Sequence, residues 1–349
     1  MAYTTINKST DYFNTKLYSG NDTNGHAITG VGFQPDWTWI KCRTHTEDHN
    51  LYDAVRGAQK SLVPNSTQVE GDYSTVLQSF NTDGFTVGTS GWVNDNGKTY
   101  ASWNWKANGA GSANTDGSIN STATSANTTT GFSIVKYTGN QTSGATVGHG
   151  LGAVPKMIIV KNLNDTENWV VYHASLGNTK RLSLNLTEEE TTDSAVWNNT
   201  TPTSSVFSLG NSDKSNNVNI PYIAYCFAEK KGYSKFGSYV GNGNADGTFV
   251  YTGFKPAFVM VKRSSGTDNW MITDNKRSSS GGNNAIDRRI LPNLSNAEYT
   301  NTSPMDILSN GFKHRDGDDI NNASGSTYIY MAFAENTFTS STGTPVTAR

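Results

Sequence analysis

Three copies of one pattern of residues follow each other along this chain, and this recurrence limits the fold more than any other feature. Each copy contains a Tyr-x-Gly-Asn motif, a Gly-x-x-Pro turn that leads into an apolar strand ending in Lys, an Asn-x-Ser/Thr-x-x-Glu box, and an aromatic-rich closing strand. Landmarks in the same order and at nearly constant spacing indicate an internal triplication. The residues that define the pattern are Pro35, Pro155, Pro256, Asn65, Asn185, Asn293, Glu70, Glu190 and Glu298.

The segments between these landmarks are typical of short strands. In the third copy, "FGSYVG", "TFVYTG", "AFVMVK", "NWMITD" and "TYIYMAFAE" are rich in Val, Ile, Tyr, Phe or Trp, and turn residues bound each run. No long segment keeps a helical period. The sequence therefore predicts an all-β chain of three tandem antiparallel β-sandwich, jelly-roll-like modules, related by the internal repeat.

The pattern also divides the chain into parts. We expect sandwich repeats over residues 11–107, 131–229 and 233–335. Residues 108–130 hold no large apolar side chain except Ile119 and are typical of a Gly/Ser/Thr/Asn linker. Only "KKGY" joins the second and third repeats, so we expect these two to pack as a rigid pair. Residues 336–349 are expected to form a loose tail.

The Asn-x-Ser/Thr-x-x-Glu box contains a glycosylation triplet, which a chain this rich in Asn, Ser and Thr produces by composition alone. A structural interpretation fits better. Thr67, Thr187 and Ser295 are followed three residues later by Glu, the spacing of a helix capping box, and the preceding Asn can hold a turn. This interpretation predicts a one-turn helix between strands. The alternative is a recognition site that occurs three times.

The strand after each Gly-x-x-Pro turn has a pleat that can be predicted. Ile40, Val160 and Val261 lie at the same distance after the repeat proline, so we expect them to share one buried face. Alternation places the next residues on the opposite face, where we expect them to reach solvent. These residues are Lys41, Lys161 and Lys262.

The composition excludes several classes of protein. With Lys+Arg 27, Asp+Glu 29 and a net charge of -2, the chain has no electrostatic footprint for nucleic acid. No apolar run approaches the roughly 20 residues that span a bilayer, and "MAYTTINKST" lacks the apolar core of a signal peptide. We therefore expect a soluble protein that is made in a cytoplasm and does not insert into membranes. Cys42 and Cys226 lie in apolar runs and are expected to be free and buried.

The sequence offers no catalytic constellation. The histidines are scattered without metal-ligand spacing, and His149 in "GHGLG" is interpreted as a turn residue. The carboxylates fall in turns such as "TDG" and "ADG", which are the expected chemistry of hairpins. A polysaccharide-degrading enzyme needs two carboxylates that flank one bond, and no such pair stands out. We expect no enzyme activity and no cofactor.

One polar loop before a closing strand is a candidate cation site. Asp316, Asp318 and Asp319 in "RDGDDINN" place carboxylates at short spacing, which hard cations such as Ca²⁺ prefer. A solvated loop has the same composition, and this second interpretation predicts no bound ion.

A second loop is a candidate ligand site. Trp92, Asn94 and Asp95 bring together an aromatic ring and polar groups that can stack on and hydrogen-bond a sugar. The alternative for Trp92, and for the nearby Trp103 and Trp105, is a place in the core.

Six longer strings complete the sequence pattern: "GFQPDWTWIK", "NLYDAVRG", "TDGFTVG", "GHGLGAVPKMIIVKN", "GSYVGNGNADGTFVYTGFKPAFVMVKR" and "YIYMAFAE". In these strings the chain resembles, along nearly its full length, repeat proteins of marine bacteriophages that infect cyanobacteria and abundant ocean bacteria. Such proteins are labelled tail-fibre-like or virion structural proteins. The resemblance implies a virion component with β-sandwich modules, and it supplies no catalytic residues.

Two classes of function fit this resemblance. In the first, the chain is a virion surface protein of the tail-fibre-like kind, an adhesin that presents loops to glycans or receptors on the host. In the second, it decorates a capsid or tail and stabilises the shell. Both imply synthesis in the host cytoplasm, a place at the virion surface and contact with other virion proteins. An adhesin gains avidity as a homotrimer, whereas three modules in one chain can also occupy a threefold position as a monomer.

Overall fold

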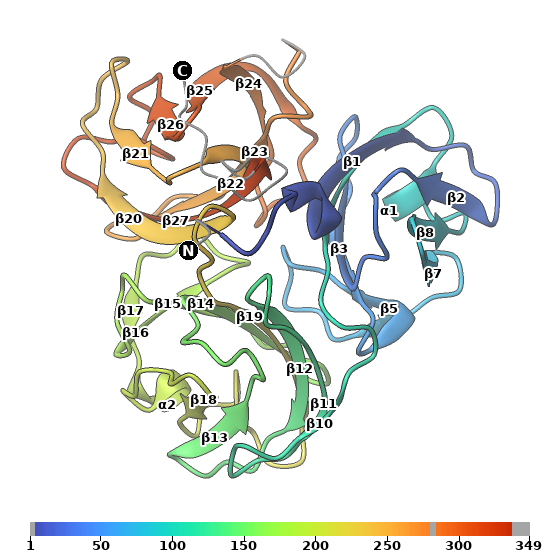
Figure 1. Ribbon diagram of the computed structural model, residues 1–349, viewed down its shortest axis with the longest axis vertical. Helices are drawn as coiled ribbons and strands as arrows, with labels where there is room; N and C mark the ends of the chain where they lie inside the picture. Colours follow the sequence, from blue (N-terminus) through green and yellow to red (C-terminus); the bar gives the residue numbers. More distant parts are fainter. Residues whose placement is uncertain (1–3, 280–283, 337–349) are drawn as a thin grey trace.

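Antiparallel sheets dominate the computed structural model, which describes residues 4–279 and 284–336 (Figure 1). Helix in the described residues is confined to single turns: η1 (Ser9–Asp11), α1 (Gly91–Asn94) and α2 (Ser194–Trp197). Short apolar runs that end at Gly, Asn and Asp turns leave no segment long enough for a longer helix. The predicted all-β sandwich class is confirmed. Of the predicted tail, all residues after Asn336 lie outside the described part.

Residues 11–107, 131–229 and 233–335 are named modules 1, 2 and 3 below. In module 1 a large sheet of order β1-β9-β3-β4-β5-β6 faces a small sheet of order β2-β8-β7. The strands of the large sheet are β1 (Phe13–Ser19), β3 (Trp37–Cys42), β4 (Asn50–Asp53), β5 (Gly57–Leu62), β6 (Gly71–Asp72) and β9 (Thr99–Trp105). Those of the small sheet are β2 (His26–Thr29), β7 (Leu77–Asn81) and β8 (Gly84–Val87).

Module 2 has the same arrangement. Its large sheet contains the order β12-β19-β14-β15-β16-β17, and its small sheet pairs β13 with β18. The strands of the large sheet are β12 (Phe132–Thr138), β14 (Met157–Asn162), β15 (Val170–His173), β16 (Lys180–Ser183), β17 (Thr191–Thr192) and β19 (Pro221–Phe227). Those of the small sheet are β13 (Ala145–Gly148) and β18 (Val206–Leu209).

Module 3 differs in one strand. Its sheets have the orders β20-β27-β22-β23 and β21-β26-β25-β24, so the counterpart of β5 and β16 joins the other sheet and keeps only the bridge Ile272–Ile290 to β23. The strands of the first sheet are β20 (Ser234–Val240), β22 (Lys255–Arg263), β23 (Trp270–Asp274) and β27 (Thr327–Asn336). Those of the second are β21 (Phe249–Tyr251), β24 (Ala285–Arg289), β25 (Tyr299–Leu308) and β26 (Gly311–His314).

The three main sheets therefore share one strand order. The first strand of each module pairs with the closing strand, the closing strand pairs with the strand that follows the repeat proline, and that strand pairs with the next one in sequence. All of these pairs are antiparallel. Sequence landmarks in the same order thus lie on strands with the same neighbours.

The segment predicted to be a linker between modules 1 and 2 is folded onto the module 2 sheet. Residues 108–130 contain β10 (Ser112–Asn114) and β11 (Ser121–Asn127), and β11 pairs with β12 at the edge of the module 2 sheet. Ile119 is buried and bridges Val147 in the small sheet. A free sheet edge offers main-chain hydrogen bonds, and a segment of small polar residues can satisfy them as well as an apolar one.

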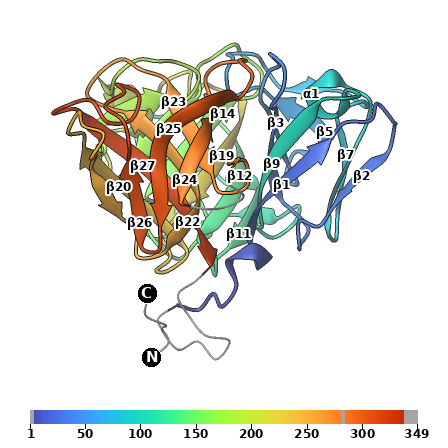
Figure 2. The same ribbon diagram turned by 90° about the horizontal axis from the view of Figure 1, so that it is seen from above.

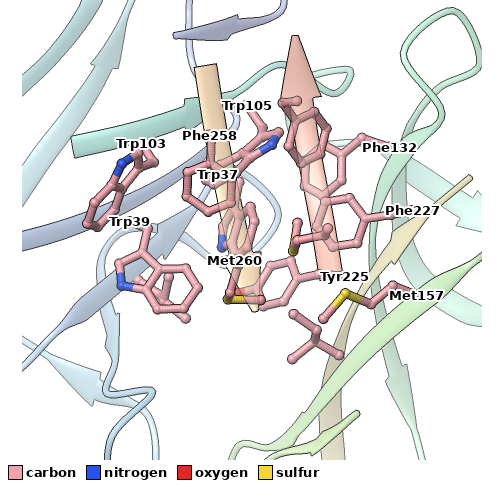
Figure 3. Packing of buried hydrophobic residues seen from close by; sticks show 14 of the residues in the cluster. Trp37, Trp39, Trp103, Trp105, Phe132, Met157, Tyr225, Phe227, Phe258 and Met260 are labelled. Atoms are coloured by element: carbon pink, nitrogen blue, oxygen red, sulfur yellow. The ribbon is translucent and has the colours of Figure 1, made fainter. Parts of the chain in front are cut away.

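A large aromatic core lies where the three modules meet (Figures 1 and 3). Trp37 of module 1 stacks on Tyr225 of module 2 with 4.6 Å between ring centroids, and Phe13 stacks on Phe333 of module 3 at 5.1 Å. All three modules share this core, whereas the sequence predicted a rigid pair of modules 2 and 3. Figure 3 labels ten of its residues: Trp37, Trp39, Trp103, Trp105, Phe132, Met157, Tyr225, Phe227, Phe258 and Met260.

Each module also has a core of its own between its two sheets. Along β3, Trp39 contributes to the shared core and Ile40 to the core of module 1. The large sheets are therefore buried on both faces. In β3, for example, every residue from Trp37 to Cys42 is buried. Figure 2 shows the same three modules in a view turned by 90°.

The predicted burial of Ile40 and its counterparts is confirmed, since Ile40, Val160 and Val261 are all 0% exposed. The prediction for the lysines is wrong. Lys41, Lys161 and Lys262 are also 0% exposed. Alternation places them on the face opposite to Ile40 as expected, but a neighbouring module covers that face. Cys42 and Cys226 are free and buried, as predicted.

Candidate functional site

The predicted Asn-x-Ser/Thr-x-x-Glu boxes lie at the three junctions between modules. The backbone N–H of Glu70 in module 1 donates to the carbonyl of Leu163 in module 2, at 2.9 Å. The N–H of Glu190 in module 2 donates to Ser264 of module 3 at 2.9 Å, and that of Glu298 in module 3 donates to Arg43 of module 1 at 2.8 Å. Each module therefore bonds to the next, and the last bonds to the first.

A second set of bonds at these junctions comes from buried ring nitrogens. Trp169 Nε1 donates to the carbonyl of Val63 at 3.1 Å, and Trp270 Nε1 donates to that of Ser183 at 2.9 Å. His49 takes the corresponding place in module 1, with Nε2 3.1 Å from the carbonyl of Leu291. The three bonds again join module 2 to 1, module 3 to 2 and module 1 to 3.

The protonation state of His49 follows from its neighbours. Its Nδ1 accepts a hydrogen bond from Trp39 Nε1 at 2.8 Å, so its proton is on Nε2, which donates to Leu291. Burial holds the pKa of His49 well below its usual range, which favours this neutral form. His49 thus replaces a tryptophan donor without bringing a buried charge.

Each box asparagine holds an earlier loop of its own module, the loop that leads into β4, β15 or β23. Asn65 Oδ1 accepts from the N–H of His49 at 2.9 Å, Asn185 Oδ1 from that of Trp169 at 3.0 Å, and Asn293 Oδ1 from that of Trp270 at 2.9 Å. Each amide nitrogen donates across the same loop, to Asp48, Asn168 or Asn269, at 2.7 Å. The asparagines thus position the three ring donors of the junctions.

The predicted one-turn helix after each box asparagine is absent from the described residues, so the capping interpretation is wrong. The main chain of the box bonds to the neighbouring module instead of to itself. The carbonyl of Thr67 accepts from Lys161 Nζ, that of Thr187 accepts from the N–H of Asp268, and that of Ser295 accepts from the N–H of Glu47. A chain whose N–H and C=O groups are used between modules cannot also close a helical turn.

The box glutamates pair with cations in different ways. Glu298 contacts Arg277 within module 3 at 2.9 Å and Arg43 of module 1 at 2.8 Å, and its side chain is only 5% exposed. Glu70 pairs with the buried Arg56 at 3.1 Å. Glu190 instead pairs with Lys180, which is 36% exposed.

This difference has a structural origin. In modules 1 and 3 the arginine is also held by an aspartate three residues earlier, in the fully buried pairs Asp53–Arg56 and Asp274–Arg277, each at 2.5 Å. In module 2 the register places His173 where the aspartates lie, and Leu176 takes the place of the arginine. Module 2 thus has a neutral ring and an apolar residue at the two positions where modules 1 and 3 have a buried ion pair.

These same positions supply a third layer of contacts between modules. Tyr225 of module 2 donates its hydroxyl to Asp53 Oδ2 at 2.8 Å, and Trp103 of module 1 donates to Asp274 Oδ2 at 2.9 Å. His173 Nε2 lies 3.2 Å from the carbonyl of Tyr330 in module 3. Every pair of modules is therefore joined both at the boxes and beside the shared core.

Two of the buried lysines, Lys161 and Lys262, bond across the junctions. Lys161 Nζ donates to the carbonyl of Glu167 at 2.8 Å and to Thr67 of module 1 at 3.1 Å. Lys262 Nζ contacts the carbonyl of Thr187 in module 2 at 3.3 Å, and Lys41 Nζ donates to the carbonyl of Cys42 at 2.7 Å. Burial lowers the pKa of each of these lysines to about 8.

Asn94, predicted to contact a ligand, is a structural residue. It is 0% exposed, accepts from the N–H of Asn21 at 3.0 Å and donates to the carbonyl of Gly88 at 2.7 Å. Asn216 and Asn322 make the same contacts in modules 2 and 3. The amide of Asn94 is thus used to hold together segments near the beginning and the end of module 1.

The other residues of that predicted ligand site also have contacts within module 1. Trp92 is half-buried and packs edge-on against Tyr73, with 5.5 Å between the ring centroids. Asp95 is half-buried, and its N–H donates to the hydroxyl of Tyr100 at 2.8 Å. Trp103 and Trp105 lie in the shared core, as their alternative interpretation predicted.

The candidate calcium loop directs its carboxylates toward separate partners. Asp316 accepts from Asn321 Nδ2 at 2.9 Å, Asp318 accepts from Arg289 at 2.7 Å, and Asp319 lies 3.6 Å from Arg263. Over residues 4–279 and 284–336, no three His, Cys, Asp or Glu side chains are grouped to hold a metal. Asp318 and Asp319 thus lie beside arginines and Asp316 lies beside an amide, so the three carboxylates do not form the cluster that the calcium interpretation requires.

The ring donors of the junctions were not predicted from the sequence. The signal was present in "ENWVVYH" and "DNWMITD", which both follow a lysine-ended strand, with "EDHNLYD" in the corresponding place of the first copy. His149, interpreted as a turn residue, lies in the turn after β13, where its Nδ1 accepts from the N–H of Leu151 at 3.2 Å.

Comparison with known proteins gives one match. The model of a family described as a domain of unknown function, DUF7483, matches residues 8–337. No curated protein and no solved structure matches the chain. Within the described residues, no helix has the length and apolar character needed to cross a bilayer.

Proposed function

For this chain, which belongs to the DUF7483 family, we propose the role of a non-enzymatic surface protein of a bacteriophage virion, of the tail-fibre-like kind. In this role it presents its outer loops and strands to glycans or receptors on the host cell. The observation that carries the proposal is the closed arrangement of three modules around one shared core, with matching contacts at all three junctions.

This arrangement suits a binding scaffold because it fixes the modules relative to one another. Aromatic stacking, main-chain hydrogen bonds and buried side chains join every pair of modules, so no module can turn independently. Loops on a rigid body keep their relative positions, which reduces the entropy lost when several of them contact one surface. The resemblance of the strings quoted above to repeat proteins of marine bacteriophages supports a place on a virion.

A second candidate is decoration of a capsid or tail. Three modules around one centre have the form of a trimer made from one chain, which fits a threefold position in a shell. In this role the contacts with the virion come from all three modules. As an adhesin, several copies of the chain, for example a homotrimer, would instead raise avidity.

Binding of the purified protein separates the two candidates. Fluorescently labelled protein is mixed in parallel with cells of the phage's host and with capsids stripped of accessory proteins, and each mixture is sedimented. The adhesin role predicts that the protein sediments with cells and not with capsids. Decoration predicts the reverse, and sedimentation with neither would contradict both.

A further inference from the structure

The outer strand of module 3 carries two exposed aromatic side chains. Phe249 is 43% exposed and Tyr251 is 60% exposed, while Val250 between them is buried in the module core at 5%. Alternation therefore places both rings on the outer face of β21, about 7 Å apart along the strand. Figure 1 shows β21 on the side of module 3 that faces away from the other two modules.

The fold does not require aromatic residues at these positions. Val250 pairs with Phe312 as Ile28 pairs with Phe85 in module 1, so the pleat of β21 corresponds to that of β2. In β2 the flanking residues are Ala27 and Thr29. Two large aromatic side chains are thus exposed to water at positions where module 1 has small side chains.

Each ring has polar groups beside it. Lys313 is the cross-strand partner of Phe249, and its ammonium group pairs with Asp246 at 2.7 Å. Tyr251 lines a pocket together with Glu229 and Lys235, which pair at 2.8 Å. The N–H of Phe236 lies 3.4 Å from Glu229 Oε2, so this carboxylate is held in place.

In module 2 another segment of the chain lies along the corresponding strand. There the corresponding strand β13 is covered by the chain of residues 114–119, and Ile119 donates its N–H to Thr146. The position corresponding to Tyr251 is Gly148, where an added Cβ would lie 1.8 Å from Asn114 Oδ1. Gly148 thus leaves room for the side chain of Asn114, whereas module 3 has Tyr251 at the corresponding position.

We propose that Phe249 and Tyr251 form a platform for a neutral saccharide, with the Glu229–Lys235 pair bonding to its hydroxyl groups. The C–H face of a pyranose is apolar and lies flat on an aromatic ring, while its hydroxyl groups need donors and acceptors at the edge of that ring. One carboxylate and one ammonium group supply both kinds of partner and add no net charge, which suits a neutral sugar. This inference rests on the proposed role in glycan attachment and names the surface that performs it.

Electrophoresis in native gels that contain laminarin, dextran or mannan tests the platform. The wild-type protein is expected to be retarded by at least one of these neutral polysaccharides. Tyr251→Thr and Phe249→Ala give module 3 the residues that module 1 has, and each should raise the polysaccharide concentration needed for half-maximal retardation at least tenfold. Val218→Thr, which changes an exposed side chain of module 2, is the control and should behave like the wild type.

The outcomes separate the platform from the proposed role. Absence of retardation in all three gels, or equal retardation of the wild type and both platform variants, would overturn the platform. If the variants lose retardation while the protein sediments with neither cells nor capsids, the platform stands and the proposed role fails. Unchanged melting temperatures of the variants show that any loss comes from binding and not from unfolding.

Discussion

Glu298 of module 3 contacts Arg43 of module 1, with Oε1 2.8 Å from Nη2, and so joins the last module to the first. The same carboxylate holds the fully buried Arg277 at 2.9 Å. Glu298 therefore has two tasks, since it balances a charge inside module 3 and closes the arrangement of modules. The side chain of its counterpart Glu190 pairs with Lys180, which is partly exposed.

The contrast between these glutamates gives the first prediction. Glu298→Ala leaves Arg277 with one carboxylate fewer in a buried site, and we expect it to lower the free energy of unfolding by about 3 to 5 kcal/mol. Glu190→Ala is the matched control, with an expected loss of about 0 to 1 kcal/mol because Lys180 reaches solvent. Urea denaturation measures both, and equal losses would contradict the assignment.

A second prediction concerns the box asparagines. Asn185→Ala removes the acceptor of the Trp169 N–H, which is buried, and we expect a loss of about 1 to 3 kcal/mol. Thr187→Ala should change stability by no more than about 0.5 kcal/mol, because the predicted helix cap does not exist. Both variants should still bind whatever the wild type binds. Loss of binding with unchanged stability would show that the box is a recognition site.

A third prediction follows from the lowered pKa of the buried lysines. A lysine with a folded-state pKa of about 8 and an ordinary pKa in the unfolded chain binds fewer protons when folded, between those two values. Stability therefore rises with pH above about 8, by at most about 1.4 kcal/mol per pH unit for each lysine. Lys161→Met removes one such contribution, so the wild type should gain stability relative to this variant between pH 7 and pH 9.5. A difference that does not change with pH would contradict the lowered pKa.

A fourth prediction tests the core of a single module. Ile40→Ala should cost about 2 to 5 kcal/mol, and Ile40→Val about 0.5 to 1.5 kcal/mol, because Ile40 is fully buried between the sheets of module 1. Thermal or urea unfolding gives both values. A loss well below about 1 kcal/mol for the alanine variant would contradict the assigned pleat.

The sequence predicted features that depend on local pattern. Alternation and turn residues were enough to predict the strands, the sandwich class and the burial of Ile40. The environment of the other face depends on what packs there, and that information is not local. Lys41 follows the predicted alternation and is nevertheless buried, because a neighbouring module covers the face that it shares with Trp39.

Main-chain bonding accounts for other differences. Residues 121–127 have too few apolar side chains to predict a strand, yet they pair along β12 through backbone groups that composition does not reveal. The spacing of Thr187 and Glu190 fits a helix cap, but their backbone groups bond to module 3. The Asp316 loop has the composition of a calcium site, and only the fold brings arginines to it.

Electron microscopy of intact virions with gold-labelled antibody against this chain tests the central claim most directly. An antibody that does not disturb the particle should label its outer surface, at the fibres or tail tip if the chain is an adhesin. Labelling spread over the shell would favour decoration. Absence of label on intact particles that carry the protein, with label only after they are opened, would contradict a surface role.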